Sequence, residues 1–243
     1  MTSAFAASQG PILSQQLLLS IAEELKMPLI RIARASEQDK LLNLSTTENT
    51  KIVQATADSA IRLLDNYILG VKLTLEPMVF NYESVSVSSI LYDSKLQLEP
   101  LAKINGVNLE LNTSSKIQPV LANRTALEAA LISLGMTLIE TIAAHPSHHQ
   151  VKLQFAAHPS RYGIVAGVYA QTKQISAQAL KAGRKLRFTS RQPFINLTYN
   201  NGAGIFVADA ILHAMSLHLT TSRHHRLYGI GTVLKPINQM QFV

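Results

Sequence analysis

The chain contains no cysteine, and no histidine precedes His145. The missing cysteine excludes disulfide bonds, thiolate metal sites and cysteine nucleophiles. The longest apolar run, 129–144, is interrupted by Glu140 and is shorter than the roughly 20 residues that a membrane-spanning helix needs. The first ten residues lack the basic start and long apolar segment of a secretory signal. We therefore expect a cytoplasmic protein without a membrane span.

Carboxylates are also missing from one long stretch, because no Asp or Glu lies between Glu140 and Asp209. The net charge of +7 is therefore uneven: residues 1–75 are neutral, 76–160 carry −2 and 161–243 carry +9. Such asymmetry belongs to one surface and predicts a binding role for it. The densest part of this basic patch consists of Lys181, Arg184, Lys185, Arg187 and Arg191. Aromatic residues are sparse there, which favours an acidic protein partner over single-stranded nucleic acid.

What the first third of the chain does contain is helical periodicity. Residues 12–37 and 50–73 each place apolar side chains at spacings of three and four, which predicts two amphipathic helices. Pro28 is expected to bend the first helix. Two such antiparallel hairpins would bury their apolar stripes in a four-helix bundle, and hence a homodimer. A monomeric hairpin packed on the C-terminal domain is the alternative.

From residue 76 onward, strands and helices are mixed. We expect strands near 79–87, 107–112, 119–121, 150–157, 162–170 and 228–237, and helices at 88–104, 124–143 and 205–217. The turn between the fourth and fifth of these strands is placed at Pro159-Ser160. This order predicts an α/β sandwich with helices on one face of a sheet. The overall fold class is thus α+β, with a disordered 1–11, a helical hairpin at 12–75 and a sandwich domain at 76–243.

Several segments resemble sensor histidine kinases, in order and over about residues 12–240. The segment 22–32, Ala-Glu-Glu-Leu-Lys-Met-Pro-Leu-Ile-Arg-Ile, is similar to the family's phosphoacceptor box on the first hairpin helix. The segment 119–123, Pro-Val-Leu-Ala-Asn, resembles the family's Pro-Val-x-Ala-Asp, and 229–233, Gly-Ile-Gly-Thr-Val, resembles its closing strand. The resemblance implies a dimerisation hairpin followed by the ATP-binding domain shared with gyrases and Hsp90-type chaperones.

The residues that carry the family's chemistry are replaced. Glu23 stands where the phosphoacceptor histidine belongs, so no catalytic residue is assigned. Thr137 occupies the place of the magnesium-binding asparagine, and a single hydroxyl is a poor substitute as a magnesium ligand. Ala170 occupies the place of the aspartate that accepts the adenine amino group. The resemblance leaves a nucleotide-binding remnant of Thr137, Gly202, Gly204, Gly229 and Gly231.

Two features admit both a functional and a simple structural interpretation. Gly202 and Gly204 precede a predicted helix, where glycines let backbone N–H groups meet phosphates, but they equally suit a tight loop-to-helix turn. The histidines at 145, 148 and 149 follow a helix and have no acid nearby to orient their rings, so no metal site is assigned. His224 and His225 lie between two arginines and are assigned to the basic patch.

The sequence therefore predicts a catalytically degenerate histidine-kinase-like signalling protein without a cofactor. Its dimer would dock a response-regulator receiver domain or another kinase through Glu23, Lys26, Met27 and Arg31, where response regulators dock in the family. The first alternative is a divergent active kinase or ATPase that holds ATP and Mg²⁺ with the remnant residues and the basic lid. The second is a nucleic-acid-binding dimer. A histidine phosphotransferase ranks last, because that class needs a hairpin histidine.

Overall fold

The computed structural model describes residues 28–32, parts of 53–69, and residues 80–114, 116–144, 151–171 and 202–237. The described residues in 28–32 and 53–69 are helical, as predicted. The disordered 1–11, the helical turn before Pro28 that would show a bend, and the connection between the two predicted hairpin helices lie outside the described residues. So do the four-helix bundle and the basic patch at 181–191.

The sandwich domain follows the predicted order closely. Its elements are β1 (Glu83–Val85), α3 (Val87–Ile104), β2 (Asn108–Thr113), β3 (Val120–Ala122), α4 (Arg124–Ala144), β4 (Lys152–Ser160), β5 (Gly163–Ala170), α6 (Gly202–Ala214), β6 (Leu219–His224) and β7 (Leu227–Leu234).

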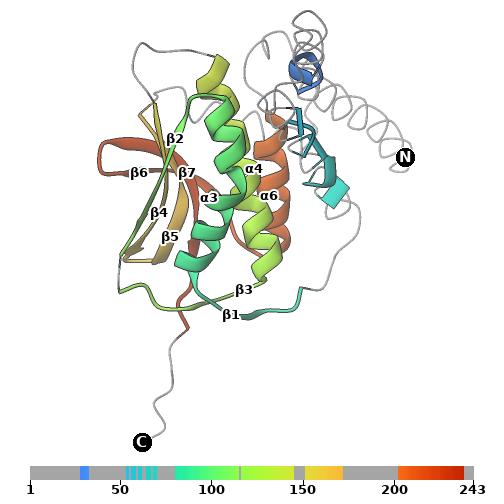
Figure 1. Cartoon of the computed structure of the whole chain (residues 1–243). Helices are drawn as coiled ribbons and strands as arrows, with labels where there is room; N and C mark the ends of the chain where they lie inside the picture. The colour runs from blue at the N-terminus through green and yellow to red at the C-terminus, as the bar shows by residue number, and fades with distance from the viewer. Residues whose placement is uncertain are drawn as a thin grey trace, which may run out of the picture.

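A five-stranded sheet in the order β2-β4-β5-β7-β6 forms one layer of this domain. The pairing of β2 with β4 is parallel, and the other pairings are antiparallel. A parallel pairing requires a crossover connection, and β3 and α4 supply it. The helices α3, α4 and α6 cover one face of the sheet, and β1 and β3 form a small separate pair at one end (Figure 1). The predicted sandwich with helices on one face is confirmed.

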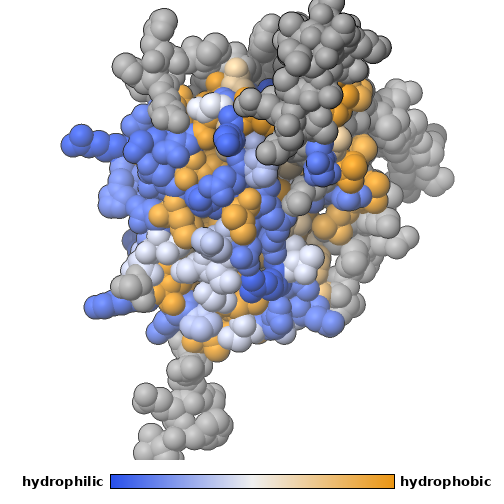
Figure 2. All heavy atoms as spheres, viewed as in Figure 1, coloured by the Kyte–Doolittle hydropathy of each residue, from blue (hydrophilic) through white to orange (hydrophobic). Residues whose placement is uncertain are grey.

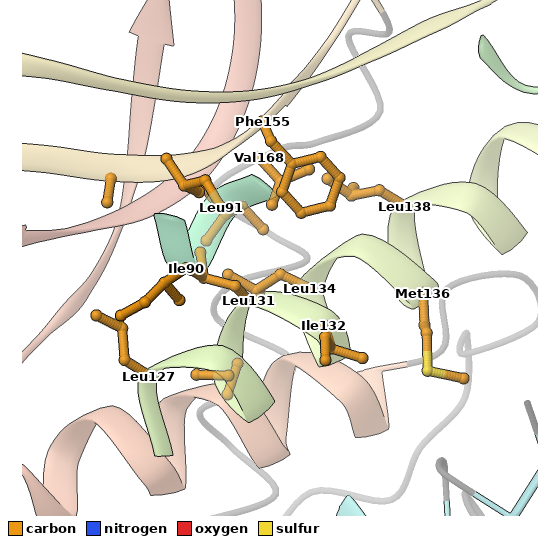
Figure 3. Packing of buried hydrophobic residues seen from close by; sticks show 14 of the residues in the cluster. Ile90, Leu91, Leu127, Leu131, Ile132, Leu134, Met136, Leu138, Phe155 and Val168 are labelled. Atoms are coloured by element: carbon orange, nitrogen blue, oxygen red, sulfur yellow. The ribbon is translucent and has the colours of Figure 1, made fainter. Parts of the chain in front are cut away.

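Helix α4 lies at the centre of the core. It contacts α3, α6 and β5, and a helix that is apolar on all sides is stable only when it is surrounded in this way. Its side chains interdigitate with Ile90 and Leu91 of α3 and with Phe155 and Val168 of the sheet (Figure 3). The fully buried α4 residues include Leu127, Leu131, Leu134 and Ile139.

The apolar part of α4 is longer than expected, because the sequence analysis took its apolar run to be too short to span a membrane. The apolar segment Arg124–Ala143 spans 20 residues with a mean hydropathy of 1.6, so by length and composition alone it could cross a membrane. However, 78% of its most apolar window is buried inside the fold. Its apolar surface is therefore used by the core of this domain.

Helix α3 begins and ends where local signals place it. The hydroxyl of Ser86 accepts a hydrogen bond from the backbone N–H of Ser89 at 3.4 Å, as an N-cap does. At the other end Gly106 adopts a positive φ of 66°, which glycine tolerates best. The backbone N–H of Val107 then donates to the carbonyl of Ala102 at 2.9 Å. Asn105 and Gly106 therefore form the turn that ends the helix.

One prediction in the sheet is wrong, and one strand was missed. The turn between β4 and β5 lies at Arg161-Tyr162, and Pro159 is still inside β4. Pairing of β2 with β4 ends at Ala157, so the missing N–H of Pro159 lies where β4 has a single strand partner. Strand β6 was not predicted, because its sequence Leu-Thr-Thr-Ser-Arg-His shows no apolar alternation. It is an edge strand whose one strand neighbour is β7.

Glycines allow β5 and β7 to approach unusually closely. Gly167 pairs with Gly231 across these strands. A Cβ atom at Gly231 would lie 2.5 Å from the carbonyl oxygen of Ala166 and 3.0 Å from Cα of Gly167. Because backbone atoms cannot move aside as a flexible side chain can, a larger residue would force the two strands apart. Glycines at such positions commonly mark bends in sheets.

We expect Gly231→Ala to lower the free energy of unfolding by about 1–3 kcal/mol, the usual cost of overpacking. Chemical denaturation monitored by circular dichroism measures this change. Thr221→Ala on the neighbouring β6 is the control, because Thr221 is exposed and such surface changes usually stay within about 0.5 kcal/mol. Removing a glycine from a strand normally stabilises it by entropy, so a gain in stability would contradict the close approach of the strands.

Candidate functional site

The candidate site predicted from the sequence lies where α4 contacts the start of α6. Thr137 is in the middle of α4 and is only 5% exposed. A Cβ atom at Gly204, in the first turn of α6, would lie 2.1 Å from Oγ1 of Thr137 and 3.0 Å from the carbonyl oxygen of Ser133. The backbone of α6 therefore touches α4 directly. No phosphate oxygen or ion fits between Gly204 and the Thr137 hydroxyl in this arrangement.

The hydroxyl of Thr137 is also engaged within its own helix. It donates to the carbonyl of Ser133 at 3.0 Å. Ser133 donates in the same way to Ala129 at 2.9 Å, and Thr141 donates to Thr137 at 2.7 Å. These three buried hydroxyls recur every four residues along one side of α4, and each donates a hydrogen bond to a backbone carbonyl in the preceding turn. They need no ligand to satisfy their donors.

The other predicted remnant residues, Gly229 and Gly231, lie on β7 away from this contact. Val168 and Ile230 belong to the core, so their neighbours Tyr169 and Gly229 lie on the opposite face of the sheet. A Cβ atom at Gly229 would lie 2.4 Å from Cδ1 of Tyr169. The Tyr169 ring therefore lies against the glycine, and its hydroxyl reaches Oγ of Ser222 at 3.2 Å. The structure brings Thr137 and Gly204 together but places Gly229 and Gly231 in the packing of the sheet.

Gly202 is the first residue of α6, and Ala170 is fully buried at the end of β5. Ala170 pairs with Leu153 on one side and Tyr228 on the other. Its methyl group can accept no hydrogen bond. At this position the described structure therefore offers no side-chain acceptor to an adenine amino group.

Of the predicted docking residues, Arg31 lies within the described part of the chain, and Glu23, Lys26 and Met27 lie outside it. The Arg31 Nη2 donates to Oδ1 of Asn105 at 2.5 Å. Asn105 in turn donates from Nδ2 to the carbonyl of Leu101 at 2.7 Å. Arg31 therefore joins the first predicted hairpin helix to the C-terminal end of α3. The histidines at 145, 148 and 149 are also outside the described residues.

A cluster of aromatic rings that the sequence analysis missed lies on the helix-free side of the sheet. His224 was assigned to the basic patch, but its side chain is buried, at 8% exposure. Its ring stacks on His158 of β4 with a centroid distance of 4.7 Å and an interplanar angle of 19°. Tyr169 and His225 contact it at 5.4 and 4.3 Å. The absence of a predicted β6 hid this cluster, since only the pairing of β6 places His224 there.

Burial changes the titration of these groups. It lowers the pKa of His224 below its ordinary value, and the neighbouring His158 and His225 lower it further. Burial is also the main cause that lowers the pKa of His158, with a smaller contribution from His225. Burial raises the pKa of Tyr169, although its hydrogen bond to Ser222 acts in the opposite direction. His224 is thus not part of a charged patch at neutral pH. Within the described residues, no group of three or more His, Cys, Asp or Glu side chains is arranged to hold a metal ion.

The comparisons with known proteins agree on the fold. No protein-family model and no curated protein matches the chain. The histidine kinase AdeS of Acinetobacter baumannii is 15% identical with a TM-score of 0.52, covering 88% of this chain and 98% of that one. Full-length ShkA, solved in complex with AMPPNP, is 14% identical with a TM-score of 0.54, covering 92% of this chain and 46% of that one. The chain therefore has a histidine-kinase-like fold with an ATPase-type sandwich.

The contact between α6 and α4 makes a direct prediction. We expect Gly204→Ala to lower the free energy of unfolding by about 1–3 kcal/mol, because the new methyl group collides with the Thr137 hydroxyl. Thr137→Ala should restore part of this loss, with a coupling energy of about 0.5–3 kcal/mol in a double-mutant cycle. Denaturant unfolding of the four proteins measures it.

The matched control for this cycle is Thr125→Ala, which removes an exposed hydroxyl from the same helix. Its effect should simply add to that of Gly204→Ala, because the two sites share no contact in the described structure. Additive effects of Gly204→Ala and Thr137→Ala would show that the two helices are not in contact at this point.

Proposed function

We propose that this chain is a catalytically degenerate histidine-kinase-like signalling protein that acts by docking and not by phosphoryl transfer. The observation that carries the proposal is the direct contact between Gly204 and Thr137. In the family that the sequence resembles, the corresponding residues face the bound triphosphate and its magnesium ion. Here a buried hydroxyl and a helix backbone occupy that space together.

Three substitutions support the same conclusion independently. Glu23 replaces the phosphoacceptor, so the hairpin carries no imidazole to phosphorylate. Ala170 replaces the carboxylate that would accept the adenine amino group. Thr137 replaces the magnesium-binding asparagine and offers one neutral oxygen where a hard cation prefers several carboxylate or amide oxygens. Together the three substitutions remove the phosphoacceptor, the recognition of the adenine base and the binding of the metal ion.

The partner in this proposal is a receiver domain or another kinase, and the location is the cytoplasm. The proposed docking surface is Glu23, Lys26, Met27 and Arg31 on the first hairpin helix. Arg31 ties this helix to the end of α3 through Asn105, which would give the docking surface a fixed position relative to the sandwich domain. The basic patch, Lys181, Arg184, Lys185, Arg187 and Arg191, would add attraction to an acidic partner.

The proposed protein is a homodimer, and an exposed apolar stripe supports this. Ile61, Leu64 and Ile68 are 56%, 38% and 52% exposed and recur at spacings of three and four on one helix. Leu29 on the first hairpin helix is 61% exposed. Apolar atoms gather on the side of the molecule where these helical segments lie (Figure 2). A second copy of the same hairpin presents a matching stripe, as expected for a symmetric interface.

The experiment that tests the loss of catalysis is calorimetric titration of the full chain with Mg²⁺-ATP, followed by incubation with labelled ATP. We expect neither heat of binding nor label on the protein, because the acceptor, base and metal contacts are replaced. Micromolar affinity that disappears in Gly204→Arg would instead establish the divergent-ATPase alternative. A gel shift with nucleic acid that weakens steeply with salt would establish the nucleic-acid alternative.

The experiment that tests the dimer is sedimentation of the wild-type chain and of Ile61→Glu/Ile68→Glu. We expect the wild type to sediment as a dimer and the double variant as a folded monomer, because two buried charges cannot be matched across the interface. Asp65→Ala, on the exposed surface of the same helix, is the control and should remain dimeric. A wild type that stays monomeric as its concentration rises would exclude the four-helix bundle.

A further inference from the structure

The stacked pair His158 and His224 connects two strands that are not neighbours in the sheet. His158 is on β4 and His224 is at the end of β6, and β5 and β7 lie between them. Their ring centroids are nevertheless 4.7 Å apart. The hairpin formed by β6 and β7 therefore bends back over the sheet. The glycine pair Gly167 and Gly231, where β5 and β7 approach closely, is of the kind that marks bends in sheets.

Neither ring of this stack is fully satisfied. Nε2 of His224 and Nδ1 of His158 are buried and have no hydrogen-bond partner among the described residues. A buried polar atom without a partner disfavours the closed arrangement, and a buried charge without a partner disfavours it far more. The stack is consequently compatible with two neutral imidazoles and poorly compatible with an imidazolium.

The groups that face the stack offer no counter-ion. From β5 the neutral Tyr169 contacts His224, and from the β6–β7 turn the ring of His225 does so. The cationic groups next to His224 in sequence are Arg223, whose guanidinium lies 4.5 Å from the ring centre of Tyr228, and Arg226. Neither arginine can act as a counter-ion to a protonated imidazole.

Carboxylates are absent from all the strands and turns around the stack. The chain contains no Asp or Glu between Glu140 and Asp209 and none after Asp209, so β4 to β7 carry only neutral and basic side chains. The sheet does contain Glu110, on β2, but it is bonded to Lys152 at 2.6 Å. Asp209 belongs to α6, on the helix-covered face. A proton on either ring would thus remain uncompensated.

We propose that the His158–His224 stack is a pH-sensitive latch that holds the β6–β7 hairpin against β4 while both rings are neutral and releases it when either ring is protonated. This device is independent of whether the chain binds ATP or a receiver domain. The hairpin includes the edge strand β6, whose start is anchored in the core by the buried Leu219 and whose end at His224 is held by the stack. Release of this end of the hairpin would uncover the Tyr169 ring.

The direction of the pH dependence follows from the environment of the rings. Burial and the neighbouring histidines hold the pKa of both imidazoles below the ordinary value of 6.5. The open hairpin, with exposed rings near that ordinary value, therefore binds protons first as pH falls. The latch should be fully stable above about pH 6.5 and should weaken progressively below it.

The test is hydrogen exchange of the full chain at about pH 7.5 and about pH 5.5, a range in which histidines titrate. We expect the protection factors of β6–β7 amides, corrected for the intrinsic pH dependence of exchange, to fall by up to about tenfold for each ring, because the lower pH is one unit below the ordinary value of 6.5. Amides of α4 should keep their protection.

The double variant His158→Phe/His224→Phe keeps two stacked rings that cannot be protonated, so it should make hairpin protection independent of pH. His218→Gln removes an exposed histidine at the start of the same hairpin and should leave the wild-type response unchanged. An equal loss of protection in the double variant would overturn the proposal. So would a wild-type His224 imidazole that titrates by NMR at or above pH 6.5 while the hairpin stays protected, a measurement that needs no variant.

Discussion

The burial of α4 is the constraint on which the rest of the domain depends. This helix is apolar on nearly all sides, and α3, α6 and β5 surround it. It provides the crossover that makes β2 and β4 parallel neighbours. The few polar groups it buries are hydroxyls, and these donate hydrogen bonds to backbone carbonyls in the preceding turn of the helix. A carboxamide in the place of Thr137 would instead need partners from outside the helix.

How much of this fold could be predicted depends on how local the determining signals are. Helix α3 was predictable because an Asn-Gly turn follows its apolar pattern. The strand before it was predicted too long, over 79–87, because the cap at Ser86 was not recognised. Helix α4 was predictable because an unbroken apolar run of this length admits few alternatives. Strand β6 was not, since an edge strand needs little apolar alternation and is recognised only by its pairing with β7. The turn was misplaced at Pro159 for a related reason. A proline is tolerated in β4 only beyond the point where the pairing with β2 ends, and the sequence does not show where that is.

The histidine stack shows the same limit at the level of a site. Its two members are 66 positions apart and lie on strands separated by two others, so no spacing in the sequence indicates their contact. The composition nevertheless indicated one feature of this site, the absence of carboxylates around it. The missing carboxylates between Glu140 and Asp209 first indicated a basic surface. In the folded chain burial and the neighbouring histidines lower the pKa of His158 and His224, and the same absence of carboxylates leaves no counter-ion on β4 to β7 that could raise it again.

Gly204 has two possible explanations, one from packing and one from phosphate binding. A glycine just inside a helix that follows a Gly-rich segment is commonly taken as a sign of phosphate binding, since small residues admit an anion at a helix N-terminus. In this chain the same glycine is required for another reason, because any Cβ atom there would collide with Thr137. Packing against Thr137 is therefore sufficient to require a glycine at this position. The glycine by itself does not indicate phosphate binding.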